Sequence, residues 1–202
     1  AGKNIEEAME PQYFIVSGMK IAFVAATRAE KFIMTPEATE TKGGVLRTYD
    51  PERFCKVIEA AKENADFVVA YVHWGTENSH QLEPVQRSQG KAYIDAGADL
   101  VVGDHPHVLQ GIEWYSGKPI FYSMGNYWFS SSPRHTMLLQ AELAKDQAGE
   151  TSTVFRLVPA WTEGGRVTAI TDPEERREFF DYMQSISEGV AIADDGAVTQ
   201  VS

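Results

Sequence analysis

Two short apolar segments, residues 66–72 and 99–103, restrict most strongly what this chain can fold into. Neither segment alternates between apolar and polar positions, which is typical of strands that are buried on both faces of a parallel sheet. Residues 84–96 lie between them, begin at a proline and stop at Gly97, a common signal for the end of a helix. Because parallel neighbours need a crossover connection, the sequence predicts a strand–helix–strand unit with a right-handed crossover.

The chain before this unit carries two further structural signals. Residues 13–16 and 20–24 are apolar and flank a Ser-Gly pair at residues 17–18, which is typical of a β-hairpin. An Asp-Pro-Glu sequence at residues 50–52 predicts a helix start, since an acidic N-cap followed by proline satisfies the first turn. We therefore expect a hairpin and one helix ahead of the central unit.

The second half of the chain has shorter, alternating apolar segments separated by Gly-containing turns at residues 115–118 and 163–165. This pattern predicts antiparallel strands. The expected strands lie near residues 108–113, 119–124, 136–143, 152–160 and 166–171. A last helix is expected over residues 173–186. The prediction is an α/β fold in one domain, residues 1–188, with an acidic, frayed C-terminal tail at residues 189–202.

Charge and cysteine content narrow the function classes. The formal net charge of −11 argues against unaided binding to nucleic acid, whose phosphates require a basic surface. A single cysteine, Cys55, rules out an internal disulfide framework, and its position on the apolar side of a predicted helix favours core packing. No apolar run reaches the roughly 18–20 residues of a membrane span, and no signal peptide is visible from Ala1 onward. We expect a processed form or a fragment.

Three histidines directly follow the two buried strands. His73 comes after the first strand, and His105 and His107 lie in a Gly-Asp-His-Pro-His sequence after the second. Ligands of open α/β sheets bind beyond the carboxyl ends of the strands, so we expect the three imidazoles to meet there. In extended backbone, positions 105 and 107 point the same way. Such a set suits a divalent metal, manganese, zinc or iron.

The same residues have simpler interpretations. A single histidine after a strand is commonly a hydrogen-bonded polar residue, and His-x-His occurs by chance, but the combination favours a metal site. His80 and His135 lie in polar stretches and are expected to be solvated. Trp74 is expected to pack in the core rather than to line a pocket.

Three blocks of sequence resemble a known family. They are YVHWGTE at residues 71–77, IDAGADLVVGDHPHVLQGIE at residues 94–113 and GKPIFYSMGNYWF at residues 117–129. Together they resemble the CapA family of bacterial capsule synthesis, or poly-gamma-glutamate biosynthesis, proteins. The resemblance runs from the start of the chain to about residue 143 and is loose beyond residue 152.

This resemblance implies a calcineurin-like metallophosphatase fold, a sandwich of mixed β-sheets flanked by helices, of which the chain is a C-terminal portion. That superfamily holds two metal ions with an Asp-x-His, a Gly-Asp, an Asn-His-Asp/Glu, a lone His and a Gly-His-x-His sequence. Only the last two have counterparts, His73 and the pair His105 and His107, and Asp104 replaces the glycine. We therefore expect one weakly bound, incompletely coordinated metal and little hydrolysis by this chain alone.

Two more residues are candidates for catalysis. Glu77 matches the first block and is expected to orient a ligand or to act as a general acid or base; a solvated loop carboxylate is the alternative. Asn126, with Ser123, closes a predicted strand end, where it could position a substrate or hydrogen-bond a ligating imidazole. A purely structural turn at Gly125 and Asn126 is equally compatible with the sequence.

The resemblance implies a phosphoesterase-type hydrolase that acts on a phosphodiester, a phosphorylated lipid carrier or an anionic polymer, outside the cytoplasmic membrane and tethered to it. The alternative is a non-catalytic component of a membrane-bound capsule polymer synthesis and export complex. A zinc amidohydrolase with Glu77 or Asp104 as base is a third possibility. An exposed sheet edge also predicts a homodimer.

Overall fold

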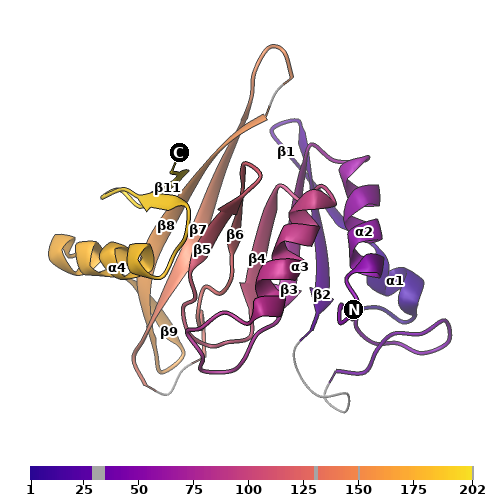
Figure 1. The fold of residues 1–202 in the computed structure, drawn as a ribbon, viewed down its shortest axis with the longest axis horizontal. Coiled ribbons are helices and arrows are strands. Elements are labelled where there is room, and N and C mark those ends of the chain that lie inside the picture. Colours follow the sequence, from indigo (N-terminus) through magenta and orange to yellow (C-terminus); the bar gives the residue numbers. More distant parts are fainter. Residues whose placement is uncertain (29–34, 130–131, 150, 202) are drawn as a thin grey trace.

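The computed structural model describes residues 1–28, 35–129, 132–149 and 151–201. Figure 1 shows two β-sheets and the helices around them. The helices are α1 (Ile5–Met9), α2 (Glu52–Lys62), α3 (Pro84–Asp95) and α4 (Pro173–Ser185). The strands are β1 (Gln12–Val16), β2 (Met19–Thr27), β3 (Phe67–His73), β4 (Leu100–Asp104), β5 (Ile112–Tyr115), β6 (Lys118–Phe121), β7 (Arg134–Lys145), β8 (Thr151–Glu163), β9 (Arg166–Ala169), β10 (Val190–Ile192) and β11 (Ala197–Gln200).

The first sheet is mixed and has the strand order β1-β2-β3-β4-β6-β5. Strands β2, β3, β4 and β6 run parallel to one another, while β1 pairs antiparallel with β2 at one end and β5 pairs antiparallel with β6 at the other. The second sheet has the order β10-β11-β8-β7, with β9 on β8, and all its pairs are antiparallel. The predicted α/β class, two sheets flanked by helices, is confirmed, as are the N-terminal hairpin and the parallel unit β3–α3–β4.

Side chains of alternate residues in β3 face opposite cores, which explains its continuous apolar sequence. Val68 and Val72 pack on one side, in a core that includes residues of α2 and α3. Phe67 and Val69 pack on the other side, in a core shared with the second sheet and α4. In Figure 1, α2 and α3 accordingly lie over one face of the first sheet, and α4 lies next to the second sheet. None of the described helices is long and apolar enough to cross a membrane.

Two expectations about the second half need correction. The strand expected near residues 108–113 starts only at Ile112, since the preceding residues form a loop in which Leu109 makes a single bridge to Met124. The C-terminal tail is not frayed: β10 pairs with β11, and β11 pairs with β8. Val190 and Val198 are each only 3% exposed, because these short strands cover the core next to α4.

Candidate metal centre

Three neighbouring strands end at one edge of the first sheet. Thr27 at the end of β2 lies opposite His73 at the end of β3, and His73 lies opposite Asp104 at the end of β4. His105 and His107 follow Asp104 in the next turn of the chain. The parallel register therefore brings the three predicted histidines to one place, as the sequence indicated.

The loop after β4 does not have the extended backbone that was expected. His105 has a φ of +95° and His107 a φ of +60°, both in the left-handed region that non-glycine residues rarely adopt. The loop is held by backbone hydrogen bonds from Trp74 N to Asp104 O, 3.1 Å, and from Asn78 N to Pro106 O, 2.7 Å. The two imidazoles thus meet through a turn rather than along a strand. Their ring centroids are 6.0 Å apart, and that of His105 lies 4.6 Å from that of His73.

Trp74 fixes the base of this loop from the core. Its side chain is fully buried, and its indole Nε1 donates a hydrogen bond to the carbonyl oxygen of Tyr122, 3.0 Å away. Gly103 lies against both groups, and a Cβ atom at that position would clash with the indole nitrogen and the Tyr122 oxygen. The predicted core role of Trp74 is confirmed, and the glycine is required by this close approach.

Glu77 and the paired histidines form a set of possible metal ligands. One ligand atom from each of Glu77, His105 and His107 lies within 4.8 Å of the other two. Metal–ligand bonds of about 2.0–2.2 Å place ligand atoms closer than this, so a modest side-chain adjustment would close the set around an ion. Glu77 is exposed and the two histidines are half-buried. His73 is not part of this set, although its ring lies against that of His105.

Two hydrogen bonds orient the imidazoles. His73 Nδ1 lies 2.8 Å from Asp104 Oδ1, and His107 Nδ1 lies 2.6 Å from Asn126 Oδ1. Both oxygens accept, so Nδ1 carries the proton in each ring and Nε2 keeps its lone pair. This arrangement is the usual support for histidine ligands of metals. Asn126, 8% exposed, follows Gly125 with a φ of +74°, so the structural turn and the contact with an imidazole are both present.

Asp104, the last residue of β4, orients His73. Its second carboxylate oxygen, Oδ2, accepts a hydrogen bond from the hydroxyl of Tyr71, 3.2 Å away. Burial, followed by the charge of Asp104, raises the pKa of Tyr71 well above its usual range, so this hydroxyl stays a donor. The sequence had suggested Asp104 only as a possible base and had given Tyr71 no role, although alternation along β3 puts Tyr71 and His73 on the same face.

The remaining histidines differ from each other. His80 is exposed, as expected, but its Nδ1 contacts the carbonyl oxygen of Leu109 at 2.9 Å. His135 was expected to be solvated, and this is wrong. Its ring is half-buried, with its centroid 3.9 Å from that of Trp161, because β7 turns it toward α4. Burial lowers the pKa of His135.

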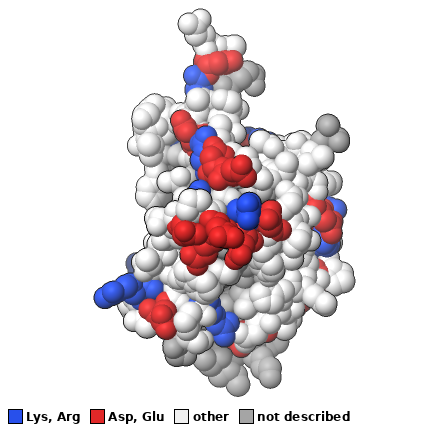
Figure 2. All heavy atoms as spheres, turned by 90° about the vertical axis from the view of Figure 1, so that its left-hand side faces the viewer, with Lys and Arg blue, Asp and Glu red and all other residues white. Residues whose placement is uncertain are grey.

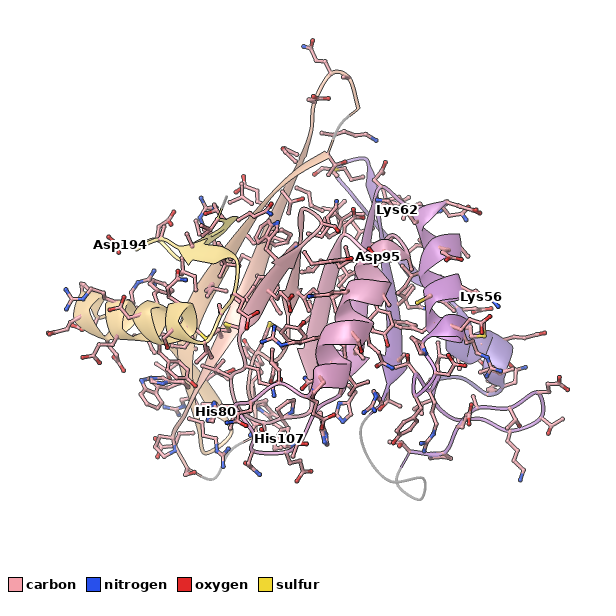
Figure 3. All side chains as sticks on the ribbon, in the orientation of Figure 1. Lys56, Lys62, His80, Asp95, His107 and Asp194 are labelled. Carbon is pink, nitrogen blue, oxygen red and sulfur yellow. The ribbon has the colours of Figure 1, made fainter. Side chains whose placement is uncertain are left out.

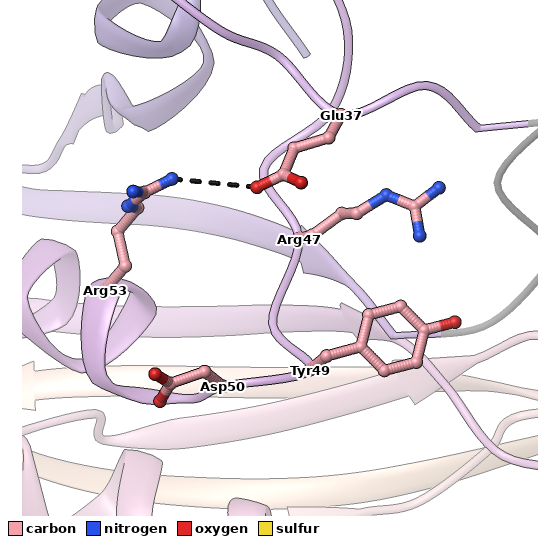
Figure 4. Close-up of a pocket in the computed structure, with 5 residues that line it drawn as sticks. All are labelled: Glu37, Arg47, Tyr49, Asp50 and Arg53. Carbon is pink, nitrogen blue, oxygen red and sulfur yellow. Dashed lines mark ion pairs between the residues drawn. The ribbon is translucent and has the colours of Figure 1, made fainter.

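A separate pocket lies farther along the same edge, beyond β2, where the backbone of Arg47 bridges to Thr27. Figure 4 shows its lining residues Glu37, Arg47, Tyr49, Asp50 and Arg53, with an ion pair of 3.7 Å between Arg53 and Glu37. Its charges are of both signs, and its described lining includes no histidine. We assign the candidate chemistry to the histidines.

The fold and this site define an α/β protein with a cluster of histidines and one carboxylate at the carboxyl ends of parallel strands. The chain belongs to the family described as bacterial capsule synthesis protein PGA_cap, which matches residues 1–131. The resemblance inferred from the three sequence blocks is thereby confirmed.

Two relatives named as capsule or PGA biosynthesis proteins are similar over a large part of the chain. The capsule biosynthesis protein CapA of Bacillus anthracis is 40% identical over 133 residues, which are 64% of this chain and 32% of that protein. The PGA biosynthesis protein CapA of Bacillus subtilis (strain 168) is 39% identical over 153 residues, 74% of this chain and 40% of that protein. The chain thus spans less than half the length of these relatives.

Among solved structures, a putative 5'-nucleotidase from Staphylococcus aureus is similar with a TM-score of 0.46 and 15% identity. The match covers 87% of this chain and 33% of that one.

Proposed function

We propose that this protein serves capsule biosynthesis as a metal-dependent hydrolase of the phosphoesterase type, with its metal centre at His73, His105, His107 and Glu77. The observation that supports this most is the convergence of Glu77, His105 and His107 within 4.8 Å. The hydrogen bonds from His73 to Asp104 and from His107 to Asn126 add the orientation that imidazole ligands need.

The donor set suits manganese, zinc or iron, which accept imidazole and carboxylate ligands. Bound there, a divalent ion would lower the pKa of a water molecule and polarise a phosphoryl oxygen. The protein's part is to hold the rings: Asp104 orients His73 and Asn126 orients His107. Glu77 supplies the negative charge, either as a ligand or as the acceptor of a proton from the attacking water.

We further propose that the chain by itself holds one ion weakly and hydrolyses little. In the part of the chain that the structure describes, the set combines neutral imidazoles with a single carboxylate. One carboxylate neutralises half the charge of one divalent ion, and a second ion about 4 Å away would repel the first.

Titration calorimetry with Mn²⁺ and with Zn²⁺ tests this proposal. We expect one metal site per chain. Its affinity for the ion should fall at least tenfold, by about 1.4 kcal/mol, in Glu77→Gln and in His105→Ala. The matched control is Glu59→Gln, an exposed carboxylate on α2, which should bind as the wild type does. Two tight sites per chain, or unchanged binding in both variants, would contradict the proposal.

The competing function is that of a non-catalytic component of a membrane-bound synthesis and export complex for an anionic polymer. An assay of phosphodiester hydrolysis separates the two functions. It uses bis(4-nitrophenyl) phosphate with Mn²⁺ and a protein that extends over the whole length of the relatives. Turnover that disappears in His105→Ala favours the hydrolase; metal binding without turnover favours the structural role.

We infer an action at the cell surface from the relatives, which are capsule biosynthesis proteins. The proposed substrate or cargo is anionic. Figure 2 shows acidic side chains gathered on the face that carries α4 and the C-terminal strands, and such a face repels polyanions. An anionic polymer, and equally a nucleic acid, would be disfavoured on the acidic part of that face.

A further inference from the structure

A pocket of about 280 Å³ adjoins the candidate metal centre. His107 lines it, together with His80, Arg134, His135 and Tyr182. Figure 3 shows His80 and His107 at the same end of the molecule. The chain has 29 acidic residues against 18 Lys and Arg, yet the described lining includes no Asp or Glu. A pocket of hydrogen-bond donors in so acidic a protein indicates that it receives a negatively charged group.

Arg134 supplies the formal charge of this pocket. Its Nη1 donates to Asn78 Oδ1 at 3.2 Å and to the carbonyl oxygen of His107 at 3.4 Å. These two contacts hold the guanidinium next to the loop after β4. Among the described residues, no hydrogen bond or ion pair engages its Nε or Nη2, and the residue is only half-buried. A guanidinium held by one nitrogen keeps the others for an oxyanion.

The hydroxyl of Tyr182 adds an uncharged hydrogen-bond donor to the pocket. Its role as a donor there follows from the position of the proton on His80. Nδ1 of His80 lies 2.9 Å from the carbonyl oxygen of Leu109 and 2.9 Å from the hydroxyl of Tyr182. A carbonyl oxygen only accepts, so Nδ1 carries the proton and has no lone pair for the hydroxyl. The single hydrogen on Nδ1 is then shared between the Leu109 oxygen and the Tyr182 hydroxyl, both of which accept, so that the hydrogen of the hydroxyl itself is available to the pocket.

His135 completes the wall as a neutral donor. Its ring lies against Trp161 and meets the edge of Phe179, with ring centroids 5.6 Å apart. Burial keeps its pKa low, although Glu175 and Glu178 act in the opposite direction. A neutral imidazole offers one N–H group and adds no charge.

We propose that this pocket binds a carboxylate group of the substrate beside His107, with Arg134 as the counter-ion and the hydroxyl of Tyr182 as a second donor. One guanidinium balances one negative charge, so a carboxylate fits better than a phosphate, which carries up to two charges near neutral pH. The inference rests on the proposed function only in treating the neighbouring histidines as the reacting centre. Binding of the carboxylate itself needs no metal.

The test uses the full chain with a chelator present and three small probes: N-acetylglycine, its neutral amide N-acetylglycinamide, and inorganic phosphate. Binding is followed by NMR through the ring signals of His80 and His135. We expect N-acetylglycine to shift both signals saturably, and to bind more tightly than phosphate. The affinity should fall roughly tenfold in Arg134→Gln, the loss of one charge-assisted hydrogen bond, and less in Tyr182→Phe.

Two controls separate this site from the metal centre. Arg166→Gln, an exposed arginine in β9, should bind as the wild type does. His105→Ala should also keep the affinity for N-acetylglycine, so that failure of the metal proposal would leave this result unchanged. Equal shifts with the neutral amide, tighter binding of phosphate, or unchanged affinity in both Arg134→Gln and Tyr182→Phe would overturn the inference.

Discussion

His107 Nδ1 lies 2.6 Å from Asn126 Oδ1, so a residue that follows β6 fixes the ring of a residue that follows β4. The two strands are parallel neighbours, with Val102 opposite Phe121. Their following loops therefore leave the sheet at the same edge. This contact holds the tautomer in which Nε2 of His107 keeps its lone pair, and it joins two sequence blocks into one site.

Replacing Asn126 should weaken metal binding without unfolding the protein. In Asn126→Ala the ring of His107 loses its acceptor and can change tautomer, and such supporting contacts are worth about 10–100-fold in metal affinity. Calorimetric titration with Zn²⁺ measures the loss. Asn64→Ala, an exposed asparagine after α2, is the matched control. Equal affinities for the two variants would show that Asn126 does not support the site.

Gly103→Ala should destabilise the fold strongly, since the added methyl group clashes with the indole of Trp74 and the backbone of Tyr122. We expect a loss of about 3 kcal/mol or more in the free energy of unfolding. In Gly117→Ala, where nothing lies within 4 Å but φ is +75°, only the backbone cost of about 1–2 kcal/mol should appear. Urea denaturation of both variants measures the two losses in the free energy of unfolding. Similar losses would mean that Trp74 and Tyr122 shift to make room for the methyl group at Gly103.

His135 should make the stability depend on pH. Burial holds its folded-state pKa below 6.5, the ordinary value, so the unfolded chain binds the proton more readily. The stability that neutral His135 contributes is complete above about pH 6.5 and is lost as the pH falls through the lower folded-state pKa. The stability of His135→Phe should change less than that of the wild type between about pH 7.5 and pH 5. An NMR titration giving His135 a pKa at or above 6.5 would contradict this.

The C-terminal strands should contribute to stability. Val198 in β11 is 3% exposed, whereas Val201, just beyond that strand, is 52% exposed. We expect Val198→Ala to lower the free energy of unfolding by roughly 2 kcal/mol and Val201→Ala to have little effect. Chemical denaturation compares them. Equal, small effects would indicate that the tail detaches in solution.

Strand β1 should promote self-association. It is the end strand of the first sheet, and its residues are exposed along its whole length, Ile15 by 76%. An uncovered apolar edge strand pairs readily with another chain, so we expect a dimer that Ile15→Lys weakens. Val154→Lys, in the interior strand β8, is the control. Light scattering that shows a monomer at all concentrations would refute this expectation.

Local pattern alone was enough to predict the elements that place the site. Strands β3 and β4 are continuous apolar runs, and the helix between them has clear start and stop residues, so each can be recognised from neighbouring residues alone. Their order along the chain puts His73, His105 and His107 at one edge of the sheet. Parallel neighbouring strands end at the same edge of the sheet, so the residues that follow them meet there whatever the conformation of the loops.

Only the tertiary structure decided which side chains support those histidines. The positive φ angles at His105 and His107, the contact with Asn126 and the position of Glu77 depend on how separate loops meet. His80 and Tyr182 touch across 102 residues of sequence. Propensity and periodicity describe neighbours along the chain, whereas these contacts arise from packing between elements far apart in it. The sequence determined where the imidazoles would gather; the packing of distant segments decided what surrounds them.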